Sequence, residues 1–311
     1  MRDTAENKPP VDFNERPFIA IWEATQACDL ACVHCRASAQ PLRSTFELST
    51  AEAQRLIDQI AEMGVPVFVF TGGDPLKRPD IFDLVEYGTA RGMRTSLTPS
   101  ATPLLTREAI AELQRCGLAR LAVSLDGSTA EIHDAFRRVP GSHEWTLQAI
   151  HWAREFGLPV QVNTTITRRN MGDFEDMARL LDTLEIAMWS VFFLVPIGRG
   201  QLDDLISAEE FEAVFAKLYQ LAERARFDIK TTEAQHYRRY VLQARAAECR
   251  RHQEEAAGTM AATTPARWNE IAVENSPDGI GRAPRGLNDA KGFVFISHFG
   301  EVFPSRTSPL R

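Results

Sequence analysis

Short runs of β-branched and aromatic residues alternate with longer helical patterns from residue 18 to about residue 226. Such alternation predicts parallel strands joined by crossover helices, and therefore an α/β fold. The expected strands number six and lie at 18–25, 65–70, 94–98, 119–127, 159–166 and 187–196. Six strand–helix units fall short of a full eight-stranded (β/α) barrel. The candidate functional residues lie in the loops after these strands, where parallel βα folds place their sites.

Local signals predict where the intervening helices begin and end. Ser49 followed by Glu52 forms a capping box at the start of the first helix, and Gly64 ends it. Gly117 is expected to provide a left-handed cap at the end of a helix over 106–116. Further helices are expected at 81–91, 144–156 and 173–184.

Composition limits the class of protein. With 311 residues, 44% hydrophobic and 25% charged, the chain is long enough for one large domain plus an appendage. No apolar run approaches the roughly 18 residues of a membrane helix. Residues 1–17 are polar and contain Pro9-Pro10, so they indicate neither a signal peptide nor an anchor, and a cytoplasmic location is expected by default. The net charge of −7, without a Lys/Arg stripe, gives little support for nucleic-acid binding.

Three of the five cysteines follow the first predicted strand as Cys28-x3-Cys32-x2-Cys35. This clustering argues against a disulfide scaffold and for a reducing compartment. Structural zinc uses four ligands, usually as two pairs, and no second pair is present. His34 could be a fourth ligand, but it is wedged between Cys32 and Cys35, where its side chain should point away from a shared metal. Because an iron–sulfur cube normally takes four cysteines, three suit a cluster with one open iron. Structural zinc and three ordinary buried thiols are the alternatives.

The cysteine trio resembles the cluster motif of the radical S-adenosylmethionine (SAM) enzymes. The resemblance implies that Cys28, Cys32 and Cys35 hold a 4Fe-4S cluster whose open iron chelates SAM, and that His34 packs near the adenine. It also implies reductive cleavage of SAM to a deoxyadenosyl radical, with electrons from an external one-electron reductant of the flavodoxin or ferredoxin type. The implied fold is an open, partial six-unit barrel.

The loop after the second predicted strand, Gly72-Gly73-Asp74-Pro75, strengthens the resemblance. Paired glycines allow the backbone to approach a ligand closely, and an acidic neighbour supplies an acceptor for a cation. In the radical SAM family a Gly-Gly-Glu-Pro motif in this place binds the methionine amino group. Asp74 is one methylene shorter than the usual Glu, a departure expected to be tolerated because the family contact is largely with a backbone carbonyl. Alone, the motif would indicate only a turn.

The fourth predicted strand ends in Ser124-Leu125-Asp126-Gly127, followed by His133-Asp134 and Arg137. This pattern is typical of the radical SAM subgroup with a C-terminal SPASM domain. The resemblance implies that Ser124 and Arg137 hold the carboxylate and ribose of SAM, since an Arg fork suits a carboxylate. His133 is expected only to orient the loop. The alternatives are a strand-end turn and a surface ion pair.

Two later strand ends supply further candidates. Asn163 lies on the fifth predicted strand, which lines the SAM site in the family, so it is predicted to contact ribose or adenine. Arg199, in Gly198-Arg199-Gly200 after the sixth strand, could bind an anionic substrate or could be a solvated loop charge. Cys116 is predicted to belong to the core, and Cys249 to be a solvent-side or packing thiol.

The last third of the chain is expected to be an extension of the core. Helices over 207–227 and 232–255 are predicted to pack against the barrel, a loop spans 256–288, and 292–304 form a hairpin. The hairpin resembles the entry to a SPASM domain, yet Ser305 stands where a cysteine commonly follows Pro304. Either the sequence is truncated or the extension holds no cluster, so we expect no auxiliary cluster within these residues and an incomplete SPASM-like C-terminus. The predicted divisions are an N-terminal tail (1–17), the core (18–226) and the extension (227–311).

These patterns predict a radical SAM enzyme similar to peptide maturases, PQQ-biosynthesis enzymes and haem-modifying radical enzymes. Its substrate would be a peptide, a tetrapyrrole or cofactor precursor, or another small molecule, with no nucleic acid or membrane as partner. The alternatives are an iron–sulfur electron carrier or sensor, a molybdopterin-type nucleotide cyclase and a zinc-bound scaffold. The cyclase would also need a C-terminal cysteine trio, which is absent from these residues.

Overall fold

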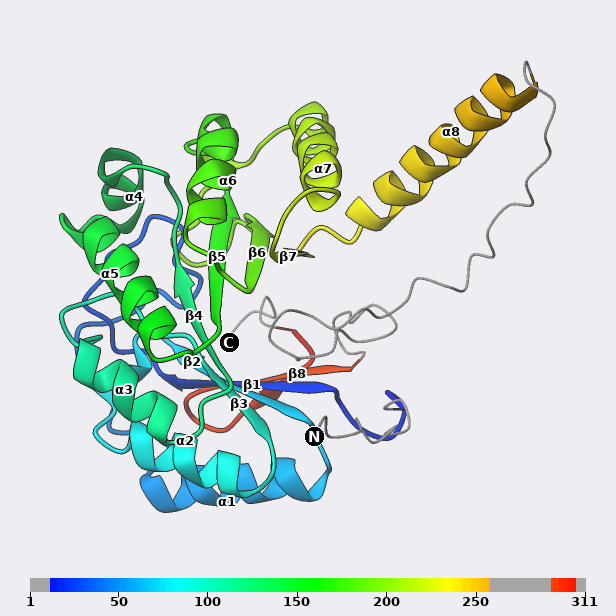
Figure 1. The fold of residues 1–311 in the computed structure, drawn as a ribbon. Coiled ribbons are helices and arrows are strands. Elements are labelled where there is room, and N and C mark those ends of the chain that lie inside the picture. The colour runs from blue at the N-terminus through cyan, green and yellow to red at the C-terminus, as the bar shows by residue number, and fades with distance from the viewer. Residues whose placement is uncertain (1–11, 258–291, 306–311) are drawn as a thin grey trace.

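The computed structural model describes residues 12–257 and 292–305. Its centre is a nine-stranded sheet in the order β7-β6-β5-β4-β3-β2-β1-β8-β9 (Figure 1). Every neighbouring pair is parallel except β8 with β9. Because β7 and β9 are the two edges of this order, the sheet is open, and the predicted partial barrel of the α/β class is confirmed.

The elements follow the predicted alternation. The strands are β1 (Ile19–Thr25), β2 (Val67–Gly72), β3 (Arg94–Leu97), β4 (Arg120–Ser124), β5 (Val160–Ile166), β6 (Met188–Phe193), β7 (Asp228–Thr232), β8 (Phe293–Ile296) and β9 (Val302–Phe303). The α-helices are α1 (Thr50–Glu62), α2 (Ile81–Ala90), α3 (Arg107–Arg115), α4 (Ala130–Arg137), α5 (Ser142–Glu155), α6 (Phe174–Thr183), α7 (Ala208–Ala222) and α8 (Tyr237–Ala257). Three 3₁₀ turns are η1 (Pro75–Lys77), η2 (Met171–Asp173) and η3 (Leu202–Asp204).

Short-range chemistry fixes several helix ends. Ser49 and Glu52 form the predicted capping box at α1, and Ser207 forms another with Glu210 at α7. Gly117 follows α3 with a positive φ of 79°, as its predicted cap requires. These signals lie within four residues of each other, so the sequence alone could locate them.

Alternating residues of each strand face opposite sides of the sheet. One side carries the large apolar core shared with the helices, including Trp22, Phe70 and Trp189. On β1, Glu23 lies between the core residues Trp22 and Ala24, and therefore faces the other side. On β4 and β5, Ser124 and Asn163 are register partners on that same side. The inner side of the open barrel is thus polar near the strand ends.

Strand β7 was not predicted. The sequence analysis expected a helix from residue 232, whereas Asp228–Thr232 form an edge strand beside β6 and α8 begins only at Tyr237. None of the five β7 residues is fully buried. The strand therefore lacks the apolar run that marks buried strands in a sequence.

The predicted packing of α8 against the barrel holds only for its first turn, where Tyr237 and Tyr240 lie against Phe215 of α7. Figure 1 shows α8 extending away from the sheet, and none of its side chains described through residue 252 is buried. Its apolar residues do not form the continuous stripe that a packed helix needs. By contrast, α7 does pack on the core, through Val214, Phe215, Leu218 and Leu221.

The predicted C-terminal hairpin is confirmed, and its position is the main surprise of the fold. Strand β8 lies parallel to β1, from Ile19↔Phe293 to Trp22↔Ile296. The hairpin turn therefore reaches the same sheet edge as the cysteine loop. Strands β7 and β8 both come from beyond residue 226 and join the core sheet. Most of the predicted loop over 256–288 lies outside the described residues.

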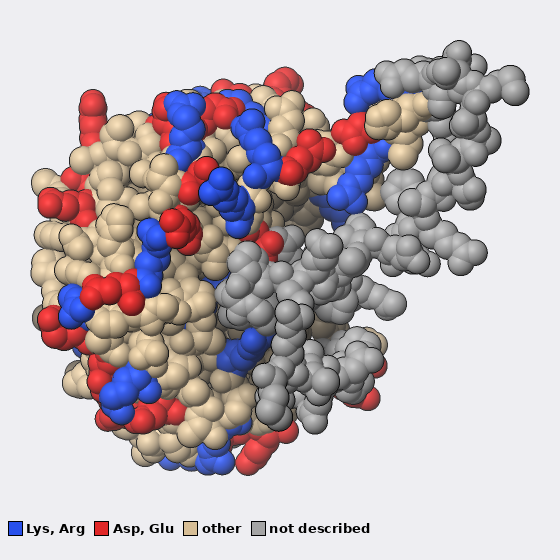
Figure 2. All heavy atoms as spheres, viewed as in Figure 1, with Lys and Arg blue, Asp and Glu red and all other residues tan. Residues whose placement is uncertain are grey.

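The described surface carries charges of both signs. On the face seen in Figure 2, basic and acidic side chains are interspersed, and no Lys/Arg stripe gathers there. Among the described helices, none combines the length and apolar character needed to cross a bilayer.

Candidate functional site

The three clustered cysteines lie at the carboxyl end of β1. Cys28 and Cys32 are buried and Cys35 is half-buried. The backbone N–H of Leu30 donates to Cys28 Sγ at 3.3 Å, and that of Ala39 donates to Cys35 Sγ at 3.5 Å. Hydrogen bonds to sulfur are one means by which proteins stabilise and tune iron–sulfur ligands. Within the described residues, no three His, Cys, Asp or Glu side chains are grouped closely enough for a single metal ion.

Burial raises the pKa of the Cys28 thiol, and the Ser100 hydroxyl, 3.2 Å away, opposes that effect. A metal ligand must be a thiolate, so this thiol becomes one when bound metal supplies compensating positive charge. The residues fit a three-thiolate cluster: the donors are soft, they lie on one loop, and each of the three sulfurs accepts an N–H.

The third sulfur is held by Arg137. Its Nη1 donates to Cys32 Sγ at 3.4 Å, and its Nη2 pairs with the fully buried carboxylate of Asp126. Asp126 also accepts from the backbone N–H of Thr165 at 2.8 Å. Burial is the largest single influence and would raise the pKa of Asp126, but Arg137, the two nearby histidines and the Thr165 N–H together outweigh it, and the pKa is lowered. The pair is buried, not on the surface, and it connects β4, β5 and the cysteine loop.

His133 has the loop-orienting place that was predicted for it. Its Nδ1 accepts from the backbone N–H of Asp126 at 3.0 Å, and its Nε2 lies 3.1 Å from Ser142 Oγ. Burial, with the nearby Arg137, lowers the pKa of His133 to about 3, so the ring is neutral. Asp126 itself was not singled out from the sequence. An Asp at the end of an apolar strand, with an Arg one helix later, was the available signal.

The paired glycines approach the cysteine loop more closely than any side chain would allow. A Cβ on Gly72 would lie 2.2 Å from the Thr25 carbonyl oxygen, and one on Gly73 would lie 2.4 Å from that of Ala27. The backbone N–H of Gly73 donates to Thr25 O at 2.8 Å. The sequence analysis explained these glycines by approach to a ligand, and the structure adds a second reason, which is contact between the two loops.

The Asp74 side chain is turned into the protein. Its carboxylate accepts from Leu76 N and Thr102 Oγ1, both at 3.1 Å, and it is fully buried. Burial raises the pKa of Asp74 to about 6. The expectation that its carboxylate presents an acceptor to a bound cation is wrong for this conformation, because the oxygens are used to join the loops after β2 and β3. Pro75 follows as the first residue of η1.

The predicted adenine and ribose contacts lie around the same edge. His34 packs against Phe136 with ring centroids 4.6 Å apart, and burial lowers the pKa of His34 to about 4. A neutral aromatic ring is therefore available beside the cysteines. Ser124 and Asn163 are adjacent in register, and Asn163 Oδ1 accepts from Gln161 Nε2 at 2.7 Å. The SAM-binding roles of these residues, of the glycine loop and of Arg137 stay predictions.

Arg199 is attached to the cysteine loop. Its backbone N–H donates to Cys35 O and its Nε to Cys32 O, each at 2.9 Å. Its Nη2 is buried and has no hydrogen-bond partner among the described residues. Gly198 permits this contact, since a Cβ there would lie 2.4 Å from Cys35 O. Arg199 therefore belongs to the site and is not a solvated loop charge.

A second buried polar group was missed from the sequence. Glu23 accepts from Arg36 and lies 3.1 Å, through Oε1, from Nδ1 of His298. Glu23 is 1% exposed and His298 is 2% exposed. A carboxylate in the middle of an apolar strand was the signal for Glu23, but no local pattern connects it to a residue 275 positions later.

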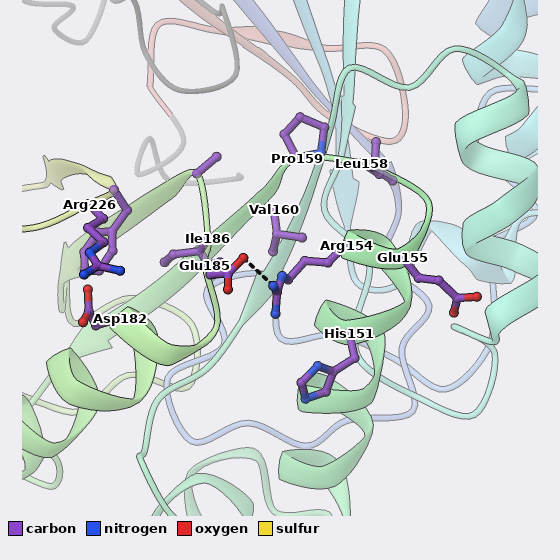
Figure 3. A pocket seen from close by; sticks show the side chains of 13 residues that line it. His151, Arg154, Glu155, Leu158, Pro159, Val160, Asp182, Glu185, Ile186 and Arg226 are labelled. Carbon is purple, nitrogen blue, oxygen red and sulfur yellow. Dashed lines mark hydrogen bonds and ion pairs between the residues drawn. The ribbon is translucent and has the colours of Figure 1, made fainter.

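The other two cysteines behave as predicted. Cys116 is buried in the main core and Cys249 is exposed. A cavity of about 640 Å³ lies elsewhere, between the α5 and α6 ends and the starts of β5 and β6 (Figure 3). Figure 3 shows Arg154 and Glu185 paired in it. It opens at the amino ends of the strands, opposite the cysteines, so we assign it no part in the chemistry.

Fold and site together define an open α/β barrel with three cysteines on one loop at the carboxyl ends of its strands. The chain belongs to the Radical SAM superfamily, whose model matches residues 22–181. It is therefore an enzyme that uses a 4Fe-4S cluster and SAM, and the electron-carrier alternative is set aside.

Curated relatives confirm the predicted subgroup. AdoMet-dependent heme synthase of Oleidesulfovibrio alaskensis is 39% identical over 290 residues, which are 92% of this chain and 69% of that protein. The protein of the same name from Methanosarcina barkeri is 36% identical, over 96% of this chain and 80% of its own length. PqqA peptide cyclase of Rhodopseudomonas palustris is 36% identical over 55% of this chain and 46% of its own.

Solved structures show the same fold. SuiB of Streptococcus suis, bound to S-adenosylmethionine, superposes with a TM-score of 0.65 at 15% identity and covers 94% of this chain. This chain spans 61% of SuiB. The enzyme anSMEcpe with bound AdoMet gives a TM-score of 0.54 at 14% identity, over 68% of this chain and 62% of its own.

Proposed function

We propose that the enzyme modifies an iron tetrapyrrole that carries carboxylate groups, by radical chemistry at the cysteine loop. The relatives named AdoMet-dependent heme synthase match 92–96% of the chain. A relative named Fe-coproporphyrin III synthase matches 63% of it. Relatives named as peptide cyclases or maturases match only 55–60%. The tetrapyrrole is favoured because the heme synthases match more of this chain than the peptide-modifying relatives do.

In this proposal Cys28, Cys32 and Cys35 hold the 4Fe-4S cluster. When bound, the cluster and SAM supply the deoxyadenosyl radical after one electron arrives from a flavodoxin- or ferredoxin-type reductant. The neutral His34 ring packs beside the adenine, and burial keeps it uncharged. Arg137 fixes Cys32 through its sulfur contact. A cytoplasmic location is part of the proposal, because these thiols need a reducing compartment.

Ser124 and Asn163 would hold the ribose side of SAM from adjacent strands. The loop from Gly72 to Pro75 would present backbone acceptors to the methionine amino group. Both groups lie at the carboxyl edge of the sheet, where parallel βα folds bind ligands.

The proposal of an anionic substrate rests on the buried Nη2 of Arg199, which has no hydrogen-bond partner among the described residues. A buried guanidinium nitrogen without a partner costs stability, and a carboxylate matches its geometry. Two hydrogen bonds, from Nε and from the backbone N–H, hold Arg199 against the cysteine loop. Tetrapyrroles of this class carry such carboxylates around an apolar ring.

The test compares substrates in anaerobically reconstituted enzyme with SAM and dithionite. Iron coproporphyrin III is expected to be consumed together with deoxyadenosine formation. Arg199→Met should raise the KM for the tetrapyrrole about tenfold or more, the value of a lost charged hydrogen bond. The exposed Arg168→Met is the control. No conversion, or equal KM values in both variants, would contradict the proposal.

A peptide is the second candidate substrate. Its support is the similarity to PqqA peptide cyclase and mycofactocin maturase, and the likeness to SuiB bound to its precursor peptide SuiA. A precursor peptide that is modified by this enzyme while iron coproporphyrin III is left unchanged would decide for this alternative.

A further inference from the structure

The turn between β8 and β9 carries a histidine that is fixed in place but not fully used. His298 Nδ1 lies 3.1 Å from Glu23 Oε1 on β1, and the two side chains are 2% and 1% exposed. Glu23 is also paired with Arg36, which follows the ligand Cys35 and lies 4.8 Å over the Phe295 ring. Two residue contacts therefore connect the histidine to the cysteine loop.

The pairing with Glu23 determines which ring nitrogen is available. A carboxylate only accepts hydrogen bonds, so Nδ1 carries the proton that is donated to Glu23. With Nδ1 as the donor, Nε2 has a free lone pair whenever the ring carries a single proton. Nε2 is buried, and no group in the described part of the chain forms a hydrogen bond with it. A histidine that donates to a carboxylate through one nitrogen and leaves the other open is the arrangement of a metal ligand.

We propose that His298 Nε2 is the axial ligand to the iron of the tetrapyrrole substrate. This inference rests on the substrate class proposed above, which supplies the iron. A tetrapyrrole fills the equatorial positions of its iron, so one histidine is enough. Glu23 is the positioning residue, since its carboxylate orients the ring and strengthens the donor nitrogen. The bond is dative, from the Nε2 lone pair to iron, and needs no further reactant.

The surroundings suit a flat apolar ring. Phe299 lies 3.7 Å from the His298 ring, centroid to centroid, and is 45% exposed. The loop before α1 is hydrogen-bonded to the turn, through Leu48 N and His298 O at 3.0 Å, and it exposes Phe46 to 79%. Phe46 and Phe299 thus add exposed aromatic surface beside the turn that carries His298.

The experiment measures the affinity of the reconstituted enzyme, without reductant, for ferric coproporphyrin III and for metal-free coproporphyrin III. The wild type should bind the iron form about tenfold or more tightly than the metal-free form, and His298→Ala should lose this difference. Glu23→Gln should weaken iron-form binding about 10- to 100-fold, as for other groups that orient metal ligands. Electron paramagnetic resonance of the ferric complex should report an imidazole ligand, which free imidazole restores in His298→Ala. The exposed His151→Ala is the matched control.

The outcomes separate the two proposals. If neither porphyrin binds the wild type, the substrate class is wrong and the ligand assignment falls with it. If both bind equally to the wild type, or if His298→Ala keeps the preference and the imidazole signal, the ligand assignment alone is overturned. Should His298→Ala fail to fold, two measurements on the wild type still test the ligand assignment. These are the ratio of its affinities for the two porphyrins and the electron paramagnetic resonance signal of its ferric complex after labelling with ¹⁵N-histidine.

Discussion

Gly73→Ala tests whether the glycine loop and the cysteine loop are built as one unit. A Cβ at this position would lie 2.4 Å from Ala27 O and 2.6 Å from Gln26 O, both backbone atoms that no side-chain rotation can move. To relieve the overlap, the loops must separate. Separation breaks the hydrogen bonds from Gly73 N to Thr25 O at 2.8 Å and from Asp74 N to Ala27 O at 2.6 Å.

The magnitude follows from these contacts. Two backbone hydrogen bonds contribute about 1 kcal/mol each. Forcing an extra methyl into a packed site costs about 1 to 3 kcal/mol. Replacing glycine returns about 0.4 to 1 kcal/mol through the unfolded chain. The free energy of unfolding should therefore fall by about 2 to 4 kcal/mol, and the displaced cysteine loop should retain less iron.

Gly172→Ala is the matched control, because Gly172 is exposed in η2 and a Cβ there would meet nothing within 4 Å. Urea unfolding of the apo proteins, followed by circular dichroism, measures stability, and iron per chain after anaerobic reconstitution measures the site. If Gly73→Ala matched Gly172→Ala in both measurements, the two loops would not be joined as described.

Three further substitutions test other parts of the site. Asp126→Asn leaves Arg137 as a buried charge without its partner, so the free energy of unfolding should fall by about 3 to 5 kcal/mol in urea titrations; a loss below about 1 kcal/mol would refute the buried pair. Burial raises the pKa of Asp74 from 3.8 to about 6, so its stabilising contribution is complete below about pH 4 and is lost as the pH rises through 6. Relative to wild type, Asp74→Asn should therefore gain about 2 kcal/mol in unfolding free energy between pH 4 and 7, and a pH-independent difference would contradict this. Cys32→Ala should abolish iron retention and SAM cleavage, whereas Cys116→Ala should keep both and lose about 1 to 2 kcal/mol of stability; equal iron content in the two variants would count against the ligand assignment.

The sequence predicted those features of the fold and site that depend on residues close together along the chain. The alternating strands and helices, the capping box at Ser49 and the cysteine spacing are patterns within a few residues of each other. The family, the cofactors and the edge of the sheet that holds the site followed from them. Strand β7 was missed and the packing of α8 was only partly right, because a polar edge strand and a helix that extends beyond the core have no distinct apolar period.

Only the tertiary structure decided which side chains meet. Arg137 with Cys32, Gly73 with Ala27, and His298 with Glu23 are separated by 105, 46 and 275 residues, and each pair depends on the order of strands in the sheet. A one-dimensional pattern records burial and period but not register between distant strands. The sequence thus predicted the loop that would bind the cluster. The folded sheet determined which charged side chains surround that loop, and it brought His298, with its unpartnered Nε2, close to it.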